Sequence, residues 1–174
     1  MQHDIRGGVL AFTAAPPPET RAVFLDRDGT LIEELHYARE VDRVRLRPGV
    51  PEALAGLRRR GYALAVISNQ SGVGRGILTV DDVLGTHART VELLQAAGIY
   101  LDAAYYCLHH PADGCACRKP GAAMLLRARD ELQVRLEDSW MIGDKESDLE
   151  AGRRAGCRVI AAAADWELAI EGQA

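Results

Sequence analysis

The 174-residue sequence lacks several features that would assign it to a specialised class of protein. It has no apolar run near the roughly 20 residues that a membrane-spanning helix needs, so no membrane partner is expected. Its N-terminus has no basic start followed by a continuous apolar stretch, which argues against a signal peptide and favours a cytoplasmic location. Basic residues are not in excess, since the net charge is −4, and a nucleic-acid partner is therefore not expected.

Cysteine is also scarce, but its spacing is informative. One of the four cysteines, Cys157, stands alone in an apolar segment and is interpreted as a small buried side chain. The other three fall within residues 107–117 together with two histidines: Cys107, His109, His110, Cys115 and Cys117. Disulfides are an alternative, but clustered Cys and His in a chain without signs of secretion more often bind metal. Three thiolates and one imidazole would make a closed tetrahedral Zn²⁺ site, in which either histidine could serve.

Composition and length predict one globular domain. Hydrophobic residues make up 48% and charged residues 26% of the chain, as in ordinary soluble domains. We expect residues 1–20 to form a flexible N-terminal arm that ends in the stiff Pro16–Pro18 spacer, and residues 21–170 to form the domain.

Hydrophobic periodicity predicts the elements of this domain. Short apolar runs predict strands, and apolar residues at helical spacing predict helices between them: strands at 22–26, 62–68, 103–106, 139–143 and 157–164, helices at 50–60, 80–97, 121–134 and 147–155. Thr79 and Asp82 form a predicted capping box at the start of the second helix. The alternation of strands and helices predicts a three-layer α/β/α sandwich with a central parallel sheet and no separate cap domain.

Unusual polar motifs follow four of the predicted strands. DRDGT (26–30) follows the first strand, SNQSG (68–72) the second, the Cys/His loop the third and GDKESD (143–148) the fourth. Because ligands bind at the carboxyl ends of the strands in such sheets, the four motifs should meet at one edge. The sequence therefore predicts one site built from segments that are far apart in the chain.

The DRDGT motif carries two carboxylates that point to the same side. Side chains alternate along an extended chain, so Asp26 and Asp28 lie about 7 Å apart on one face. Such carboxylates repel each other unless a cation or a proton intervenes. They are either turn residues that end the strand, or a nucleophile and a general acid/base beside Mg²⁺. Arg118 and Lys119 would supply the positive charge that phosphoryl transfer needs.

Over residues 22–160, the sequence resembles the haloacid dehalogenase-like phosphatases. It contains four motifs in the same order as that family: LDRDGT, ISN, RKP and GDKESD. The segment CxHH…CxCRKP is similar to the branch that contains heptose bisphosphate phosphatases and histidinol-phosphatases. This resemblance implies that Asp26 attacks phosphorus to form an aspartyl-phosphate and that Asp28 is the general acid/base. It also implies a catalytic Mg²⁺ bound by Asp26, Asp28 and Asp144, and a structural Zn²⁺ in the loop 107–117 bound by Cys107, His109, Cys115 and Cys117.

The same resemblance implies roles for the residues around the reacting phosphate. Ser68 and Lys119 would complete the catalytic group, and the expected substrate contacts are Arg27, His36, Tyr37, Asn69, Gln70, Ser71 and Arg118. His36 and Tyr37 could instead belong to a solvated loop, and Asp148 could be a helix cap or a residue beside the metal. His87 falls on the apolar stripe of its helix and is interpreted as a packed structural residue.

The resulting expectation is a Mg²⁺-dependent phosphomonoester hydrolase that acts on a small phosphorylated sugar. Within the branch, the expected reaction is removal of the 7-phosphate of D-glycero-D-manno-heptose 1,7-bisphosphate. The alternatives are a histidinol-phosphate phosphatase, a 3′-phosphatase of nucleic acid and a non-enzymatic zinc-loop interaction module on the same fold. A monomer is favoured, and the sequence leaves the oligomeric state open.

Overall fold

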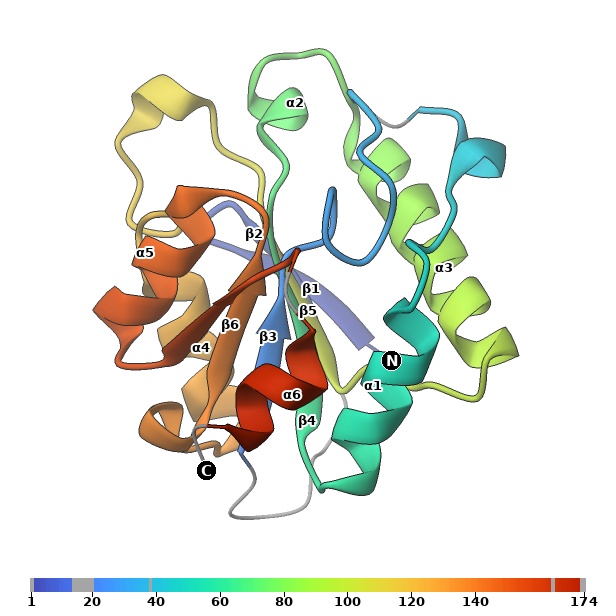
Figure 1. Cartoon of the computed structure of the whole chain (residues 1–174). Coiled ribbons are helices and arrows are strands. Elements are labelled where there is room, and N and C mark those ends of the chain that lie inside the picture. The colour runs from blue at the N-terminus through green and yellow to red at the C-terminus, as the bar shows by residue number, and fades with distance from the viewer. Residues whose placement is uncertain (1, 14–20, 38, 164, 173–174) are drawn as a thin grey trace.

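A seven-stranded sheet lies between two layers of helices in the computed structural model of the protein (Figure 1). The structure describes residues 2–13, 21–37, 39–163 and 165–172. The strands are β1 (Gln2–Arg6), β2 (Val9–Thr13), β3 (Ala22–Leu25), β4 (Ala63–Asn69), β5 (Ala103–Cys107), β6 (Trp140–Gly143) and β7 (Arg158–Ala161). The helices are α1 (Val50–Arg59), α2 (Ser71–Gly74), α3 (Val80–Ala96), α4 (Ala123–Leu132), α5 (Glu146–Ala155) and α6 (Trp166–Glu171).

The strand order across the sheet is β1-β2-β5-β4-β3-β6-β7. The strands from β5 to β7 in this order run parallel, and the hairpin β1–β2 is added antiparallel to β5. The carboxyl ends of the parallel strands therefore share one edge, at the top of Figure 1, where α2 and the loops after β3 and β5 lie. This confirms the predicted α/β/α architecture.

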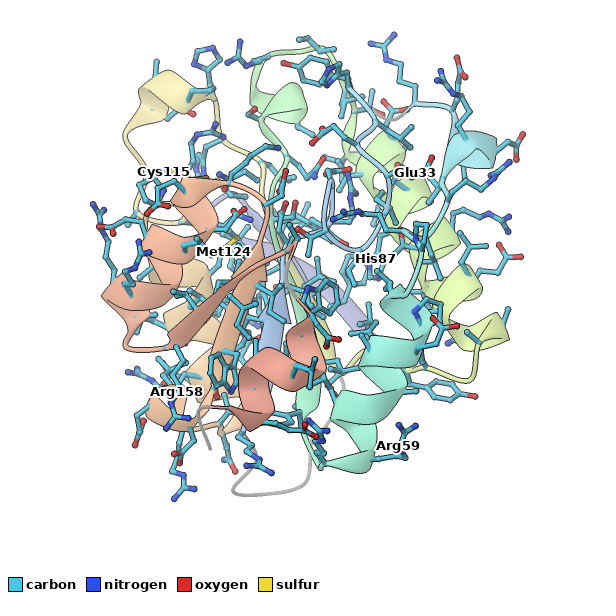
Figure 2. The ribbon with its side chains drawn as sticks, viewed as in Figure 1. Glu33, Arg59, His87, Cys115, Met124 and Arg158 are labelled. Carbon is cyan, nitrogen blue, oxygen red and sulfur yellow. The ribbon has the colours of Figure 1, made fainter. Side chains whose placement is uncertain are left out.

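The alternation of side chains along the strands separates two hydrophobic cores. In β3, Val23 and Leu25 pack on the side that α1, α3 and α6 cover, whereas Phe24 packs on the side of α4 and α5. Figure 2 labels one residue from each side, His87 on α3 and Met124 on α4. Because helices cover both faces, the central parallel strands β3, β5 and β6 are buried at every residue.

The predicted helix boundaries are confirmed to within a few residues. Thr79 Oγ1 accepts a hydrogen bond from Asp82 N at 3.1 Å, and Asp82 Oδ2 accepts one from Thr79 N at 2.7 Å, which completes the predicted capping box. Gly61 follows α1 with φ of +80°, a conformation that glycine adopts without steric cost. The last strand is shorter than the predicted 157–164, because β7 ends at Ala161. Neither α2 nor α6 is predicted by the sequence pattern, since each is too short to show helical periodicity.

The N-terminal prediction is wrong for residues 2–13, which form a hairpin at the edge of the sheet instead of a flexible arm. Gly7 and Gly8, with φ of +54° and +70°, form its two-residue turn, and such turns need positive φ at both positions. Burial of Val9, Leu10 and other apolar residues of β2 holds the hairpin on the sheet. A Gly-Gly pair between two short β-prone segments is the signal that predicts such a hairpin. The Pro16–Pro18 spacer lies outside the described residues.

No additional domain covers the carboxyl edge of the sheet in the described part of the chain. The segment between β3 and α1 contains a single 3₁₀ turn, Val41–Arg43, and the segment after β4 forms α2. Loops, the short helix α2 and the start of α5 therefore surround the space above the strands. Among the described residues, no helix has both the length and the apolar character needed to cross a membrane.

Candidate active site

Loops after four parallel strands surround a cavity of about 430 Å³ at the carboxyl edge of the sheet. Glu33 and Cys115, labelled in Figure 2, mark the loops after β3 and β5 at this same end of the molecule. The predicted catalytic and substrate-contacting residues all border the cavity: Asp26, Arg27, Asp28, His36, Tyr37, Ser68, Asn69, Gln70, Ser71, Arg118 and Lys119. The predicted convergence of the motifs at one edge is thus confirmed.

Lys119 connects two buried carboxylates at the floor of the cavity. Its Nζ lies 2.7 Å from Asp26 Oδ1 and 2.7 Å from Asp148 Oδ1, and it donates a hydrogen bond to the Ile67 carbonyl at 2.7 Å. Burial alone lowers the pKa of Lys119, but the two carboxylates more than offset this effect, so the net shift is upward. Lys119 is therefore a fixed cation beside Asp26.

Asp148 combines the two roles that the sequence left as alternatives. Its Oδ2 accepts a hydrogen bond from Lys145 N at 3.0 Å, which caps the start of α5, and its Oδ1 pairs with Lys119. Burial raises the pKa of Asp148, and the Lys119 ammonium lowers it by a smaller amount. Asp148 therefore fixes the position of Lys119 and of α5 together.

Three residues predicted to contact substrate also hold other site residues in place. Arg27 is buried and donates through Nε and Nη2 to both oxygens of Asp28, with the shortest contact at 2.9 Å. Gln70 Nε2 donates to Asp28 Oδ2 at 2.8 Å and to Ser68 Oγ at 3.2 Å. The Asn69 side chain donates through Nδ2 to the Lys119 carbonyl at 3.1 Å, and its Oδ1 accepts a hydrogen bond from Lys119 N at 3.0 Å. These contacts fix the Asp28 carboxylate and the backbone that carries Lys119.

Asp144 brings a further carboxylate to the same corner of the site. Oxygens of Asp26, Asp144 and Asp148 lie within 4.8 Å of one another. A Cβ added to Gly29, whose φ is +82°, would lie 2.5 Å from Asp144 Oδ2, so glycine allows the close approach. Burial raises the pKa of Asp144; the Lys145 charge opposes this, and Asp26 adds to it. Both oxygens of Asp148 are engaged, by Lys119 and by Lys145 N, whereas Asp26 pairs with Lys119 through Oδ1. The carboxylates of Asp26 and Asp144 therefore fit a hard cation such as Mg²⁺.

Two buried arginine nitrogens at the cavity lack a hydrogen-bond partner. They are Nη1 of Arg27 and Nη1 of Arg118, which have none within the part of the chain that the structure describes. An unpaired buried donor is costly, and a guanidinium group matches the oxygens of a phosphate group. The arrangement is therefore suited to an anionic ligand.

The rim of the cavity is formed by the loop after β3 and the start of α5. Glu34 Oε2 lies 3.1 Å from Lys145 Nζ, so an ion pair spans one side of the opening. The His36 side chain is 93% exposed, and Tyr37 is partly exposed with φ of +56°. Sequence reasoning missed the ion pair because no local pattern relates residues 111 positions apart.

The Cys/His loop gathers four potential metal ligands beside the cavity. His109 Nδ1 lies 3.1 Å from Cys117 Sγ, and the three sulfurs lie 3.2 to 3.7 Å apart. Two thiolates at ~2.3 Å from one tetrahedral Zn²⁺ would be about 3.8 Å apart, so the group is close to the required size. Burial raises the pKa of Cys107 and of Cys117, which means that thiolates here need a cation. The donor set therefore fits zinc.

The structure distinguishes the two neighbouring histidines of this loop. His109 belongs to the group of potential ligands with Cys107, Cys115 and Cys117. His110 Nδ1 instead accepts a hydrogen bond from Ala112 N at 3.0 Å and caps a 3₁₀ turn. The alternative in which His110 completes the group is therefore not supported.

His87 has the structural role that the sequence predicts. Its ring stacks on Phe12 at a centroid distance of 3.8 Å, and its Nδ1 lies 2.9 Å from the Tyr106 hydroxyl. Burial, with a smaller contribution from the Arg27 charge, lowers the pKa of His87 to about 4. The ring is therefore neutral near pH 7. Cys157 is likewise a buried free thiol, as predicted.

The fold and the site together define a hydrolase of the phosphatase class, with a buried aspartate–lysine pair at the carboxyl end of a central parallel strand. A family model for haloacid dehalogenase-like hydrolases matches residues 33–156, and the chain belongs to this family.

Named relatives fall within the same group. The chain is 37% identical over 167 residues to D-glycero-beta-D-manno-heptose-1,7-bisphosphate 7-phosphatase of Yersinia pestis, a match that covers 84% of this chain and 89% of that protein. It is similar to the crystal structure of a haloacid dehalogenase-like phosphatase from Mesorhizobium loti, with a TM-score of 0.82 and 33% identity. This match covers 87% of this chain and 78% of that chain. It is also similar to the crystal structure of D,D-heptose 1,7-bisphosphate phosphatase from B. bronchiseptica in complex with magnesium and phosphate, with a TM-score of 0.75 and 31% identity. This match covers 80% of this chain and 79% of that chain.

Proposed function

We propose that the protein is a Mg²⁺-dependent phosphatase that removes the 7-phosphate of D-glycero-D-manno-heptose 1,7-bisphosphate. The observation that carries this proposal is the buried pair of Asp26 and Lys119 at a cavity that Arg27 and Arg118 also border. These cations favour a phosphorylated ligand. The names of the relatives from Yersinia pestis and B. bronchiseptica support the choice of substrate.

Asp26 and Asp28 carry out the two chemical steps of this mechanism. A carboxylate oxygen of Asp26 forms a bond to phosphorus while the bond from phosphorus to the substrate oxygen breaks, and Asp28 donates a proton to that oxygen. Asp28 then takes a proton from water, which attacks phosphorus and releases phosphate and the Asp26 carboxylate. The Arg27 and Gln70 contacts hold Asp28 in one orientation for both proton transfers.

Cations and hydroxyls around Asp26 stabilise the transferring phosphoryl group. Lys119, 2.7 Å from Asp26, reduces repulsion between the carboxylate and the incoming phosphate. Ser68 is buried beside it and offers a hydroxyl to a phosphate oxygen. Asp26, Asp144 and the backbone carbonyl of Asp28 would hold Mg²⁺. When bound, Mg²⁺ supplies positive charge that offsets the negative charge of the transition state.

Arg118 is placed to bind the second phosphate of the substrate. It borders the cavity next to Lys119, and we expect its guanidinium group to bind an anion other than the one at Asp26. Ser71, His36 and Tyr37 lie around the opening and would contact the sugar. With no cap domain in the described residues, these loops alone must bind the remote part of the substrate.

Histidinol phosphate is a weaker candidate because the site offers its amine little attraction. Glu33 and Glu34 are the acidic residues of the loop after β3 that could receive an amine. Glu33 does not border the cavity, and Glu34 is paired with Lys145 at 3.1 Å. The cations at the opening therefore favour a second phosphate over an ammonium group.

We expect kcat/KM for the heptose bisphosphate to exceed that for histidinol phosphate by at least about tenfold, equivalent to about 1.4 kcal/mol. Steady-state phosphate release with both substrates measures this ratio. A reversed preference would assign the protein to histidinol phosphate instead.

Arg118→Ala should lower kcat/KM for the bisphosphate more than for a sugar monophosphate, because only the bisphosphate has a second anion to lose contact. Arg75→Ala is the matched control, since Arg75 is exposed on the neighbouring loop and does not border the cavity. Equal losses on the two substrates in Arg118→Ala would place Arg118 at the reacting phosphate or in the fold.

We further propose that Cys107, His109, Cys115 and Cys117 bind a structural Zn²⁺ that fixes the loop carrying Arg118 and Lys119. Protein purified without chelator should contain about one zinc ion per chain by elemental analysis. Cys115→Ser should lower the zinc content and, indirectly, the turnover. Cys157→Ser changes a buried thiol outside the cluster and should retain zinc. An absence of zinc from the wild-type protein would contradict the site.

A further inference from the structure

The N-terminal hairpin lies directly against the Cys/His loop. Val9 at the start of β2 pairs with Cys107 at the end of β5. Leu108 N then donates a hydrogen bond to the Gly8 carbonyl at 3.0 Å. The turn of the hairpin therefore continues the sheet contact as far as the residue that precedes His109.

The contact between Gly8 and the His109 ring is close enough to exclude any side chain. A Cβ on Gly8 would lie 2.3 Å from Cε1 and 2.4 Å from Nε2 of His109. Nδ1 of the same ring would lie 3.0 Å from this Cβ, and it faces Cys117 Sγ at 3.1 Å and Cys107 Sγ at 3.6 Å. The imidazole thus contacts both the turn of the hairpin and the thiols.

The hairpin is itself anchored, so it cannot easily withdraw from the ring. Asp4 on β1 forms an ion pair with Arg127 on α4 at 2.6 Å, and Arg127 also pairs with Glu131 at 2.7 Å. Glu131 accepts a hydrogen bond from the Tyr105 hydroxyl on β5 at 2.9 Å. These contacts connect the hairpin to α4 and to the strand that leads into the Cys/His loop.

We propose that the N-terminal hairpin is a positioning element for the zinc site, and that Gly8 sets the orientation in which His109 Nδ1 faces the three thiolates. The inference rests on the zinc site proposed above. Mutation of residues that orient a metal ligand typically lowers metal affinity or activity by about 10–100-fold. Because Cys117 is followed directly by Arg118 and Lys119, the hairpin also acts on the active site through the loop.

The test compares two adjacent glycines in the zinc-loaded, full-length protein. Gly7 and Gly8 both have positive φ, so alanine strains the backbone at either position, but a Cβ on Gly7 meets no atom within 4 Å. The rate of zinc transfer to a colorimetric chelator is the readout. Gly8→Ala should release zinc about 10–100-fold faster than Gly7→Ala, if the typical loss of affinity on mutating a residue that orients a metal ligand is expressed in the release rate. Equal rates in the two variants would overturn the proposal.

His109→Cys provides a second test that does not depend on the folding of Gly8→Ala alone. A cysteine in place of the ring leaves room for a Cβ at position 8 and completes a Cys₄ zinc set. Adding Gly8→Ala to His109→Cys should therefore give a folded protein with unchanged zinc release. Faster release, or loss of the folded far-ultraviolet circular dichroism spectrum, would overturn the proposal.

Failure of the hairpin proposal can be distinguished from failure of the proposed phosphatase function. Zinc release is measured without substrate, so an inactive protein that holds zinc still tests the hairpin. A wild-type protein without zinc would refute the zinc site, and with it this inference, whereas the phosphatase assignment rests on Asp26 and its cavity.

Discussion

Asp26→Asn is expected to keep the fold and to lower kcat by at least about 10⁴-fold, since removal of the nucleophile from a covalent hydrolase costs up to about 10⁶. An amide cannot form the acyl-phosphate that the mechanism requires. The fold should survive because the amide oxygen still accepts a hydrogen bond from Lys119, and Asp148 keeps its charge beside the same ammonium group. Phosphate release and the thermal unfolding midpoint measure the two parts of this expectation.

A rapid-quench experiment identifies the step that is lost. Wild-type protein mixed with substrate labelled on the reacting phosphate should carry a covalent, hydroxylamine-sensitive label, and Asp26→Asn should carry none. Asp42→Asn is the control, because Asp42 is exposed and lies outside the cavity. Substantial turnover or labelling in Asp26→Asn would refute the covalent mechanism.

Lys119→Met should have the largest combined effect on stability and turnover. It removes the cation that lies 2.7 Å from both Asp26 and Asp148 and leaves two buried carboxylates unpaired. Breaking a buried pair in this way typically costs about 3–5 kcal/mol in the free energy of unfolding. Turnover should fall as well, because phosphate must then approach uncompensated negative charge. Denaturant unfolding without added divalent cations and phosphate release measure the two losses.

The stability loss in Lys119→Met should depend on pH. Burial already raises the pKa of Asp148 in the folded protein, and loss of the Lys119 charge raises it further. An aspartate whose folded pKa exceeds its unfolded value destabilises the protein at high pH; this penalty begins to shrink as the pH falls through the folded pKa and is gone below the unfolded pKa of about 3.9. The deficit relative to wild type should therefore be smaller in acidic than in neutral buffer.

Lys145→Met is the matched stability control for this result. Its side chain is 56% exposed, and its ammonium group faces Glu34 and Asp144 at the rim, where water screens the charges. Exposed pairs contribute about 0–1 kcal/mol, so the control should lose far less stability than Lys119→Met. Similar losses in both variants, or a deficit in Lys119→Met that does not vary with pH, would contradict the buried pair as the cause.

The elements of the fold were predictable where a local pattern is strong. Apolar runs mark β3, β4 and β6 because helices cover both faces of the sheet, and the Thr79–Asp82 capping box marks the start of α3. The hairpin over residues 2–13 was missed, although its Gly7–Gly8 turn is visible in the sequence. Its strands are short and the second pairs with β5, nearly a hundred residues away, so their stability depends on a nonlocal contact.

The composition of the site was predictable in the same way, whereas the roles of individual side chains were not. The positions of Asp26 and Asp28 follow from strand alternation and from the rule that ligands bind at the carboxyl ends of parallel strands. Arg27 lies between these two residues in the sequence. No local pattern predicts that its guanidinium group donates hydrogen bonds to the Asp28 carboxylate. That geometry depends on the burial of Arg27 beneath the cavity.

The sequence by itself determined the layer architecture, the edge of the sheet at which the motifs meet and the donor types available there. These properties follow from side-chain periodicity and from the chemistry of each residue, both of which are local. Only the tertiary structure decided that Asp148 pairs with Lys119 and that Gly8 lies against the His109 ring, and it places His109, which the family resemblance implies, rather than His110 beside the cysteines. Each of these contacts joins residues from different segments, or selects one of two adjacent residues, and it depends on the packing of the whole chain.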